Sequence, residues 1–182
     1  VKYPKWMVAF KFPAIEKITR IKAITLQVGR TGVVTPVAEV EAVNIEGVVV
    51  ERATLHNFDE IERKNIKIHD SVIIIRSGDV IPKIIKVLEE RRTGEEWAIE
   101  RPKECPICGG ELLDDGALLK CQNLSCDARV VGAMIHFASK KALNIDGLGD
   151  KIIEQLYAQK MIAHVKDLFH LSEEMLLSLE GF

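Results

Sequence analysis

The four cysteines of this 182-residue chain all fall within the segment CPICGGELLDDGALLKCQNLSC, residues 105–126. They form two close pairs, Cys105-x2-Cys108 and Cys121-x4-Cys126, and twelve residues separate the pairs. Two such pairs supply the four thiolate corners of a tetrahedral zinc site, and the glycines between them allow tight turns. Because a four-thiolate shell leaves no open position on the metal, the predicted zinc is structural rather than catalytic.

Two alternatives to this site are open from the sequence. In the first alternative, the cysteines form two disulfides in a secreted domain, although nothing else in the sequence indicates secretion. His136 is a rival ligand, but it lies ten residues past Cys126, inside a predicted helix. We therefore expect the four cysteines to bind the metal.

The residues before the cysteines read as short β-strands with alternating apolar side chains. One stretch, residues 58–65, has a helical pattern instead, with Asn57 as its candidate N-cap and Glu60 three residues on. The predicted strands cover residues 18–28, 33–43, 48–55, 70–77 and 80–88. Five strands with a helix between the third and fourth is the order of an all-β OB-fold barrel. Such barrels often bind nucleic acid, but the fold alone does not establish function.

Two polar turns of the predicted barrel place a cation beside glycine. Gly29-Arg30-Thr31-Gly32 offers a guanidinium and a hydroxyl, and Arg76-Ser77-Gly78-Asp79 offers a second such pair. Turns of this kind can approach a phosphate closely. Taken alone, each is more often a solvated hairpin tip.

The residues after the cysteines predict an α-helical segment. Residues 129–143 fit an amphipathic helix, and a glycine turn at 146–150 leads into a second helix. Helix, Gly-x-Gly hairpin and helix is the helix-hairpin-helix form, in which backbone N–H groups near Gly147 and Gly149 face a DNA phosphate and Lys151 adds one charge. A plain turn between two helices is the alternative. Residues 171–182 start a further helix.

The charge is distributed unevenly along the chain. The net charge is −2, but residues 1–43 carry seven Lys/Arg against three Glu, whereas residues 105–182 carry seven Lys/Arg against eleven Asp/Glu. A polyanionic partner would therefore meet mainly the first part, or backbone amides. No apolar run is long enough for a membrane span, and the start has no signal-peptide shape, so we expect a cytoplasmic protein without a membrane partner. We also expect the chain to be an excised piece of a longer protein.

Ordered motifs run through all of the chain: WMVAFKFPA, QVGRTGVVTPVA, RATLHN, GDVIP, the four-cysteine spacing, HFASKKALNIDGLG and LEGF. In this order they closely resemble a region of the NAD-dependent DNA ligases of bacteria. The resemblance implies a multidomain organisation in four parts. These are the last strand of a nucleotidyltransferase domain (1–12), an OB-fold domain (13–100), a four-cysteine zinc finger (101–128) and the start of a helix-hairpin-helix domain (129–182).

The resemblance implies that the parent enzyme seals nicks in duplex DNA. A lysine of such enzymes attacks the α-phosphate of NAD and expels nicotinamide mononucleotide. The adenylate then passes to the 5′-phosphate of the nick, and the 3′-hydroxyl displaces AMP with the help of a divalent metal such as Mg²⁺. The implied cofactors are thus structural zinc in this chain and NAD and Mg²⁺ for the full enzyme.

The family's active-site residues can be carried over only in part. Lys11 matches the final active-site lysine, which contacts the adenylate phosphate. The nucleophile of the family sits in a Lys-x-Asp-Gly motif, but the Asp-Gly pairs at Asp115 and Asp146 are preceded at that position by Leu113 and Asn144. We therefore expect the chain alone to be inactive with NAD and unable to join DNA.

The resemblance also implies DNA contacts on two turns of the barrel. Arg30 and Thr31 match residues of the first turn, and Arg76, Val80 and Ile81 match a second loop that lies against the minor groove near the nick. The cation can bind phosphate, while the apolar side chains press on sugars. The residues alone would have indicated core positions for Val80 and Ile81.

Two other functions compete with the ligase hypothesis. The first is a free-standing, non-catalytic nucleic-acid-binding module with an OB-fold, a zinc finger and a helix-hairpin-helix. The second is a protein-binding scaffold. The segment WMVAFKFPA favours the ligase hypothesis, because a stand-alone module has no reason to keep an active-site strand. We expect the chain to be a monomer whose partner is nicked double-stranded DNA, bound weakly and with salt sensitivity.

Overall fold

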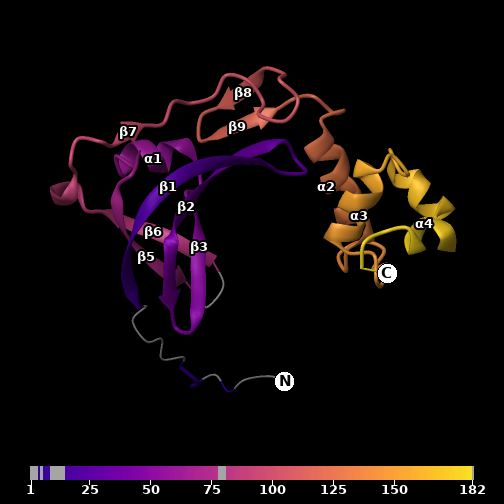
Figure 1. Ribbon diagram of the computed structural model, residues 1–182, viewed down its shortest axis with the longest axis horizontal. Coiled ribbons are helices and arrows are strands. Elements are labelled where there is room, and N and C mark those ends of the chain that lie inside the picture. Colours follow the sequence, from indigo (N-terminus) through magenta and orange to yellow (C-terminus); the bar gives the residue numbers. More distant parts are fainter. Residues whose placement is uncertain (1–3, 5, 9–14, 78–80, 182) are drawn as a thin grey trace. The chain divides into compact units, whose positions relative to one another are not determined.

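A computed structural model describes residues 4, 6–8, 15–77 and 81–181 of the chain (Figure 1). The chain divides into two compact units. The barrel unit comprises Val1–Thr25, Val37–His56 and Glu60–Ile99, and the finger-helix unit comprises Leu26–Pro36, Asn57–Asp59 and Glu100–Phe182. A short hairpin tip, residues 26–36, is thus grouped with the cysteines rather than with the strands from which it extends.

Five strands of the barrel unit close into a ring in which β1 pairs with β2 and β5, β3 pairs with β2 and β6, and β5 pairs with β6. The β3–β6 pair is parallel, with Thr54 opposite Lys83, whereas the β1–β5, β2–β3 and β5–β6 pairs are antiparallel. The helix α1 (Phe58–Arg63) follows β3, so the predicted order of five strands and one helix is confirmed. The strands are β1 (Glu16–Val28), β2 (Val33–Ile45), β3 (Val48–Thr54), β5 (Ser71–Ser77) and β6 (Ile81–Val87).

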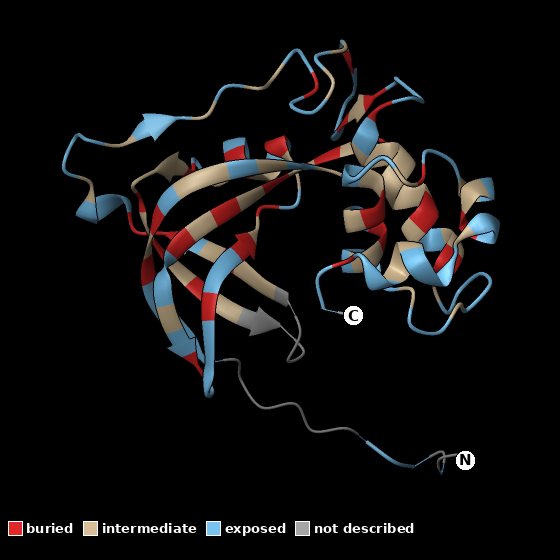
Figure 2. Cartoon of the chain, turned by 45° about the vertical axis from the view of Figure 1, so that its right-hand side comes forward, coloured by how far each residue is buried: buried red, intermediate tan, exposed pale blue. Residues whose placement is uncertain are grey.

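The barrel core follows the two-residue period of its strands. In β2, Val34, Pro36, Ala38 and Val40 are buried, and the residues between them are half-buried. This alternation is expected for a strand whose successive side chains point to opposite faces of the sheet. Figure 2 marks the same alternation as red bands along the barrel strands. Because of this alternation, the two-residue period of apolar side chains was enough to predict these strands from the sequence.

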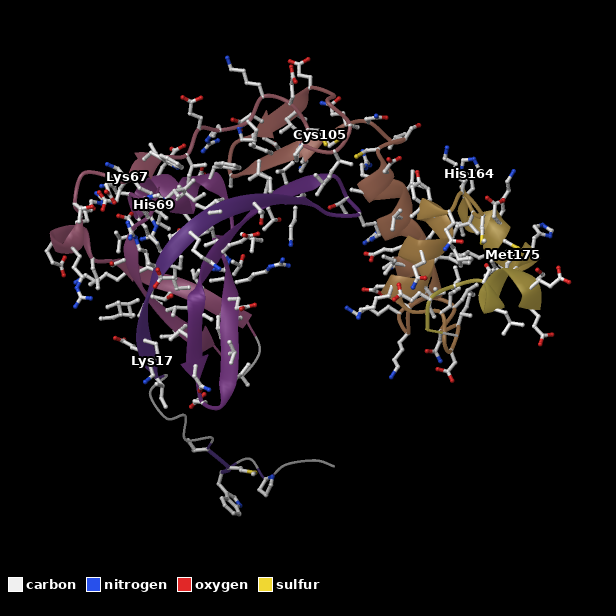
Figure 3. The ribbon with its side chains drawn as sticks, in the orientation of Figure 1. Lys17, Lys67, His69, Cys105, His164 and Met175 are labelled. Atoms are coloured by element: carbon white, nitrogen blue, oxygen red, sulfur yellow. The ribbon has the colours of Figure 1, made fainter. Side chains whose placement is uncertain are left out.

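A small two-stranded sheet was not predicted from the sequence. Its strands, β4 (Lys67–Ile68) and β7 (Trp97–Ala98), have only two residues each, which is too short for a periodic signal. The rings of His69 and Trp97 lie 5.2 Å apart beside this sheet, and Figure 3 labels His69 next to Lys67. A 3-10 turn, η1 (Glu89–Arg91), lies between β6 and β7 in the sequence.

Asp70 is the one carboxylate that is buried among the described residues, and its side chain is fully enclosed. Arg92 donates to it from Nε at 2.8 Å and from Nη2 at 2.9 Å, and the backbone N–H of Lys67 donates at 2.7 Å. The hydrogen bonds with Asp70 raise the pKa of Arg92 above its ordinary value, so the guanidinium stays charged. The pair links the residue before β5 to the residue after η1.

The finger-helix unit consists of a short hairpin and four helical segments. Its helices enclose a core of seven buried residues: Met134, Ala138, Ile153, Leu156, Ile162, Leu168 and Leu179. The elements are β8 (Leu112–Asp115), β9 (Leu118–Cys121), α2 (Asp127–Ala138), α3 (Asp150–Ala158), η2 (Val165–His170) and α4 (Glu173–Leu177).

The helix predicted over residues 129–143 ends five residues early, at Ala138. Its last carbonyls are satisfied by residues beyond the helix, since Leu143 N–H donates to Phe137 at 3.1 Å and Ile145 N–H donates to Ala138 at 2.9 Å. The helix-compatible residues 140–143 therefore turn back to close the helix end. In the part of the chain that the structure describes, none of the helices combines the length and apolar character needed to cross a bilayer.

We expect Arg92→Leu to lower the free energy of unfolding of the barrel unit by about 3–5 kcal/mol, because Asp70 would stay buried without its cation. Urea unfolding followed by circular dichroism measures the loss. Arg63→Leu is the matched control, since Arg63 pairs with Glu60 and its side chain is 65% exposed. The control should leave the unfolding midpoint almost unchanged. Equal effects of the two variants would contradict the importance of the buried pair.

Candidate metal centre and nucleic-acid interface

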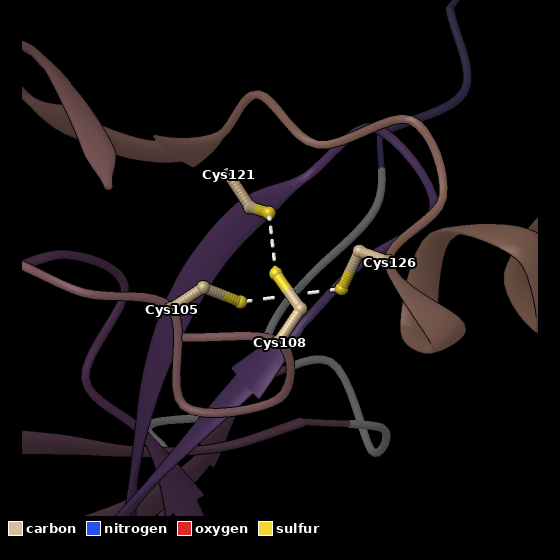
Figure 4. A group of neighbouring side chains, drawn as sticks. All are labelled: Cys105, Cys108, Cys121 and Cys126. Atoms are coloured by element: carbon tan, nitrogen blue, oxygen red, sulfur yellow. Dashed lines mark hydrogen bonds between the residues drawn. The ribbon is translucent and has the colours of Figure 1, made fainter. Parts of the chain in front are cut away.

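The structure brings the four cysteine sulfurs together, with all four Sγ atoms within 4.8 Å of one another (Figure 4). The Cys105 and Cys126 sulfurs lie 4.0 Å apart, and those of Cys108 and Cys121 lie 3.6 Å apart. These separations exceed a disulfide bond of about 2.05 Å, and the four cysteines are free. With zinc–sulfur bonds of about 2.3 Å, a tetrahedral site separates its sulfurs by roughly 3.8 Å. The arrangement therefore fits one tetrahedral metal ion.

Local turns and one hairpin position the four thiols. The backbone N–H of Cys105 donates to Gly110 at 2.7 Å, and that of Gly109 donates to Cys105 at 2.9 Å, which closes the first pair into a tight loop. The β8–β9 hairpin then carries the chain to Cys121. Cys126 is the N-cap residue of α2. His136 is exposed in the last turn of α2 and does not belong to this cluster of sulfurs.

The electrostatic environment of the thiols differs from residue to residue. Hydrogen bonds from the Gly110 backbone and the Asn123 side chain lower the pKa of Cys108 to about 7. Burial raises the pKa of Cys121 to about 12, and burial also raises the pKa of Cys126. These donors thus favour a thiolate at Cys108, whereas Cys121 and Cys126 favour the charged form only beside a cation. A divalent ion held by all four sulfurs would supply that cation.

The cysteine cluster is bonded directly to the hairpin tip, residues 26–36. The β9 strand pairs with β2 in antiparallel register, with Lys120 opposite Val33. The Cys121 N–H donates to the Gly32 carbonyl at 2.8 Å. A Cβ at Gly32 would lie 2.4 Å from the Cys121 carbonyl oxygen, and Gly32 has φ +84°. Only glycine fits there, because both the conformation and the contact exclude a side chain.

The helix α2 holds the same tip from a second side. Gly132 lies against the backbone of Arg30, since a Cβ there would approach the Arg30 Cα and Cβ to 3.1 Å. Arg129 donates from Nη1 to the Cys121 carbonyl at 3.0 Å. Arg129 and Gly132 were not predicted as functional residues from the sequence. A glycine inside an amphipathic helix is the signal that was available, because it often marks a close approach of another segment.

The first predicted DNA contact lies on this tip. Arg30 and Thr31 are both exposed, in a turn closed by Gly29 N–H to Val33 at 2.9 Å and by Gly32 N–H to Gly29 at 2.8 Å. The guanidinium and the hydroxyl are therefore presented to solvent by a turn whose backbone is held on both sides.

The second predicted contact region is only partly described. The backbone of Arg76 lies in β5 opposite Pro82, and that of Ile81 starts β6 opposite Ser77. Val80 and the catalytic candidate Lys11 lie outside the described residues. Their predicted roles, and those of the Arg76 and Ile81 side chains, remain predictions.

The predicted helical hairpin corresponds to the turn between α2 and α3. Gly147 has φ +79°, and its N–H donates to the side chain of Asp146 at 3.1 Å. Gly149 is the N-cap residue of α3, where no side chain caps the helix. Lys151 is exposed in the first turn. Uncapped N–H groups at a helix N-terminus can bind an anion. This turn therefore offers backbone hydrogen-bond donors for the predicted phosphate contact.

We expect Gly32→Ala to loosen the hairpin tip and the cysteine cluster together. The left-handed conformation alone costs about 1–3 kcal/mol for alanine, and the clash with the Cys121 carbonyl adds to it. Gly116→Ala is the control, because Gly116 has φ +66° and open space around its Cβ position. Thermal unfolding and the rate of metal transfer to a chelator should both change more for Gly32→Ala. Equal changes in the two variants would mean that the contact between the new Cβ and the Cys121 carbonyl does not destabilise the protein.

Comparison with known proteins finds similarity to DNA ligases along the whole chain. Residues 18–96 match the family described as the NAD-dependent DNA ligase OB-fold domain. Over all 182 residues, the chain is 66% identical to proteins named DNA ligase from Sulfurovum sp. (strain NBC37-1) and Sulfurimonas denitrificans, and 60% identical to one from Campylobacter jejuni. It spans 28% of the length of each of these relatives. The chain is therefore homologous along its whole length to a segment of bacterial DNA ligases, and its residues 18–96 belong to the OB-fold domain family of the NAD-dependent DNA ligases.

Proposed function

We propose that this chain is the DNA-embracing part of an NAD-dependent DNA ligase that seals nicks in duplex DNA. The observation that carries the proposal is the 66% identity to DNA ligases over every residue of the chain. Within the whole enzyme, the OB-fold barrel, the zinc finger and the helical segment bind the nicked duplex and present it to the nucleotidyltransferase domain. The working form is a cytoplasmic monomer.

The proposed reaction proceeds through two adenylates. An enzyme lysine attacks the α-phosphorus of NAD, and nicotinamide mononucleotide leaves. The AMP group then passes to the 5′-phosphate of the nick, and the 3′-hydroxyl displaces AMP as the new phosphodiester bond forms, with Mg²⁺ stabilising the charge on the phosphates. Lys11 is the supporting cation at the adenylate phosphate. The nucleophile is absent from this sequence, because neither Asp-Gly pair is preceded by Lys at the required position.

The four cysteines hold one structural zinc ion in this proposal. The sulfur separations of 3.6 and 4.0 Å support a tetrahedral thiolate site. The metal ties the β8–β9 hairpin to α2, and the bond from Cys121 to Gly32 extends this restraint to the hairpin tip. The zinc thereby positions Arg30 and Thr31, which are the first DNA-contacting pair.

The interaction with DNA is proposed to be weak and independent of sequence. With a net charge of −2, the chain has no general attraction to a polyanion, so binding relies on local cations and backbone N–H groups. Phosphate contacts of this kind suit a nick-sealing enzyme, because the nick can lie in any sequence.

The purified chain should neither form a covalent AMP adduct with NAD nor seal a nicked duplex. Mass spectrometry and a gel assay with a labelled nick measure the two steps, with an intact homologous ligase as the positive control. Adding the N-terminal part of that ligase in trans tests whether the chain completes an active enzyme. Sealing by the chain alone would show that the chain contains a nucleophile, contrary to our proposal.

Removal of the metal should abolish the binding of nicked duplex. We expect one zinc ion per chain by native mass spectrometry. Cys121→Ser should lose the metal and the DNA affinity together, since metal binding contributes on the order of 10–16 kcal/mol to small zinc folds. Ser125→Ala, an exposed change in the same loop, is the matched control and should retain both. Tight DNA binding by a metal-free chain with oxidised thiols would contradict the structural zinc site.

A further inference from the structure

A small notch of about 270 Å³ opens on the finger-helix unit beside the hairpin tip. Three nitrogen-bearing side chains line it, namely Arg30 of the tip, Arg129 of α2 and His164, which precedes η2. Figure 3 labels His164 on the helical part of the chain, where its side chain is exposed. The three residues come from segments far apart in the sequence, so the notch exists only in the folded unit.

The charge of the notch favours an anion. None of the residues that line it carries a carboxylate. Among the described residues, the ion pairs involve neither arginine, and one nitrogen of Arg129 is used by the Cys121 carbonyl. Arginine has five N–H donors, so most donors of Arg129 remain for a ligand. The nearby Asp167 does not line the notch, and its Oδ2 accepts from the backbone N–H groups of Ala163 and His164 at 2.8 Å.

The rest of the lining is apolar and indicates what accompanies the anion. Leu124, Val130, Ala133 and Val165 complete the notch, and Leu124 is 76% exposed at its edge. Cations beside apolar side chains match alternating phosphate and deoxyribose groups, because the guanidinium binds the phosphate while the apolar surface covers the sugar. A free inorganic anion would leave the exposed leucine without a role.

The notch is rigidly built rather than formed by loose surface chains. The backbone of Arg30 lies against Gly132, and Arg129 is fastened to the carbonyl of Cys121. Cys121 is itself one of the four clustered cysteines. A fixed arrangement of donors reduces the entropy that is lost when a ligand binds.

A larger hollow of about 760 Å³ in the same unit offers a contrast. It is lined by the Asp127 carboxylate, which accepts a hydrogen bond from the Tyr157 hydroxyl at 2.7 Å, and by Lys160. A carboxylate in the lining repels phosphate, so this hollow is not a second site of the same kind. Lys160 is exposed and provides a cation on the same unit but outside the notch.

We propose that the notch formed by Arg30, Arg129 and His164 binds one phosphate of the DNA backbone together with its sugar. The inference rests on the proposed function and adds Arg129 and His164 to the DNA-contacting residues. The hairpin tip and the helical segment would then act together, because both contact the same phosphate.

The test uses the full 182-residue chain and a short nicked duplex, with affinity measured across a range of salt concentrations. Arg129→Gln and His164→Ala should each weaken binding roughly tenfold at low salt, as expected for the loss of a charge-assisted hydrogen bond. The double variant should lower the slope of log affinity against log salt by about 0.9, the value for one phosphate. Lys160→Ala should change affinity less than about twofold and leave this slope unchanged.

Ethylation of individual phosphates in the duplex locates the contact. One ethylated position should weaken binding of the unmodified chain but not of the double variant. Arg129 also supports the cysteine cluster, so metal content is measured for each variant, and His164→Ala tests the notch without disturbing that cluster.

Three results separate the outcomes. If Arg129→Gln and His164→Ala bind like the unmodified chain while the chain itself binds nicked DNA, the notch assignment is wrong and the proposed function stands. If Lys160→Ala weakens DNA binding as much as the notch variants, the affinity depends only on the positive charge of the surface, and the assignment of the notch as a phosphate site is wrong. If the unmodified, metal-loaded chain does not bind nicked DNA, the proposed function and the notch fail together.

Discussion

The contact between Gly32 and Cys121 is the constraint on which the finger-helix unit depends. One hydrogen bond joins the Cys121 N–H to the Gly32 carbonyl, and the Cys121 carbonyl leaves no room for a side chain at Gly32. The same carbonyl accepts from Arg129, so three segments meet at the backbone of Cys121. Because Cys121 also belongs to the four-sulfur cluster, any force that orders the sulfurs also orders the turn that carries Arg30.

Features with a local or periodic signature could be predicted from the sequence. The spacing of the four cysteines indicated their convergence, and alternation in strands such as β2 indicated the barrel and its element order. Features that arise from tertiary contact could not. The helix α2 ends at Ala138 although the next residues suit a helix, because Leu143 and Ile145 return to its carbonyls. The buried pair of Asp70 and Arg92 joins residues 22 positions apart, and no local pattern announces it.

The candidate DNA surface illustrates the same limit. Arg30 was predicted as a candidate phosphate contact because it lies in a glycine-flanked turn, where a polar side chain is expected to be exposed to solvent. Arg129 and His164 carry no such mark, since an arginine in an amphipathic helix and an exposed histidine are ordinary surface residues. They become informative only when the fold places them around one notch. Charge counted along the chain even points away from this unit, because residues 105–182 are net acidic.

For the proposed DNA contact, local arrangement therefore matters more than net charge, and we propose that a metal held by the four cysteines stabilises this arrangement. The β8–β9 hairpin pairs with β2 at only Val33 and Val34, and of its own side chains only Leu112, Leu119 and Cys121 are buried. Without a cation, burial disfavours the charged forms of the Cys121 and Cys126 thiols, whose pKa values are raised. A divalent ion bound by all four sulfurs would favour the charged forms and would hold the hairpin, α2 and the hairpin tip in one geometry. In the proposed function, zinc and DNA binding would be linked through the hairpin tip rather than by direct contact, because the ion would not touch the nucleic acid that it helps to position.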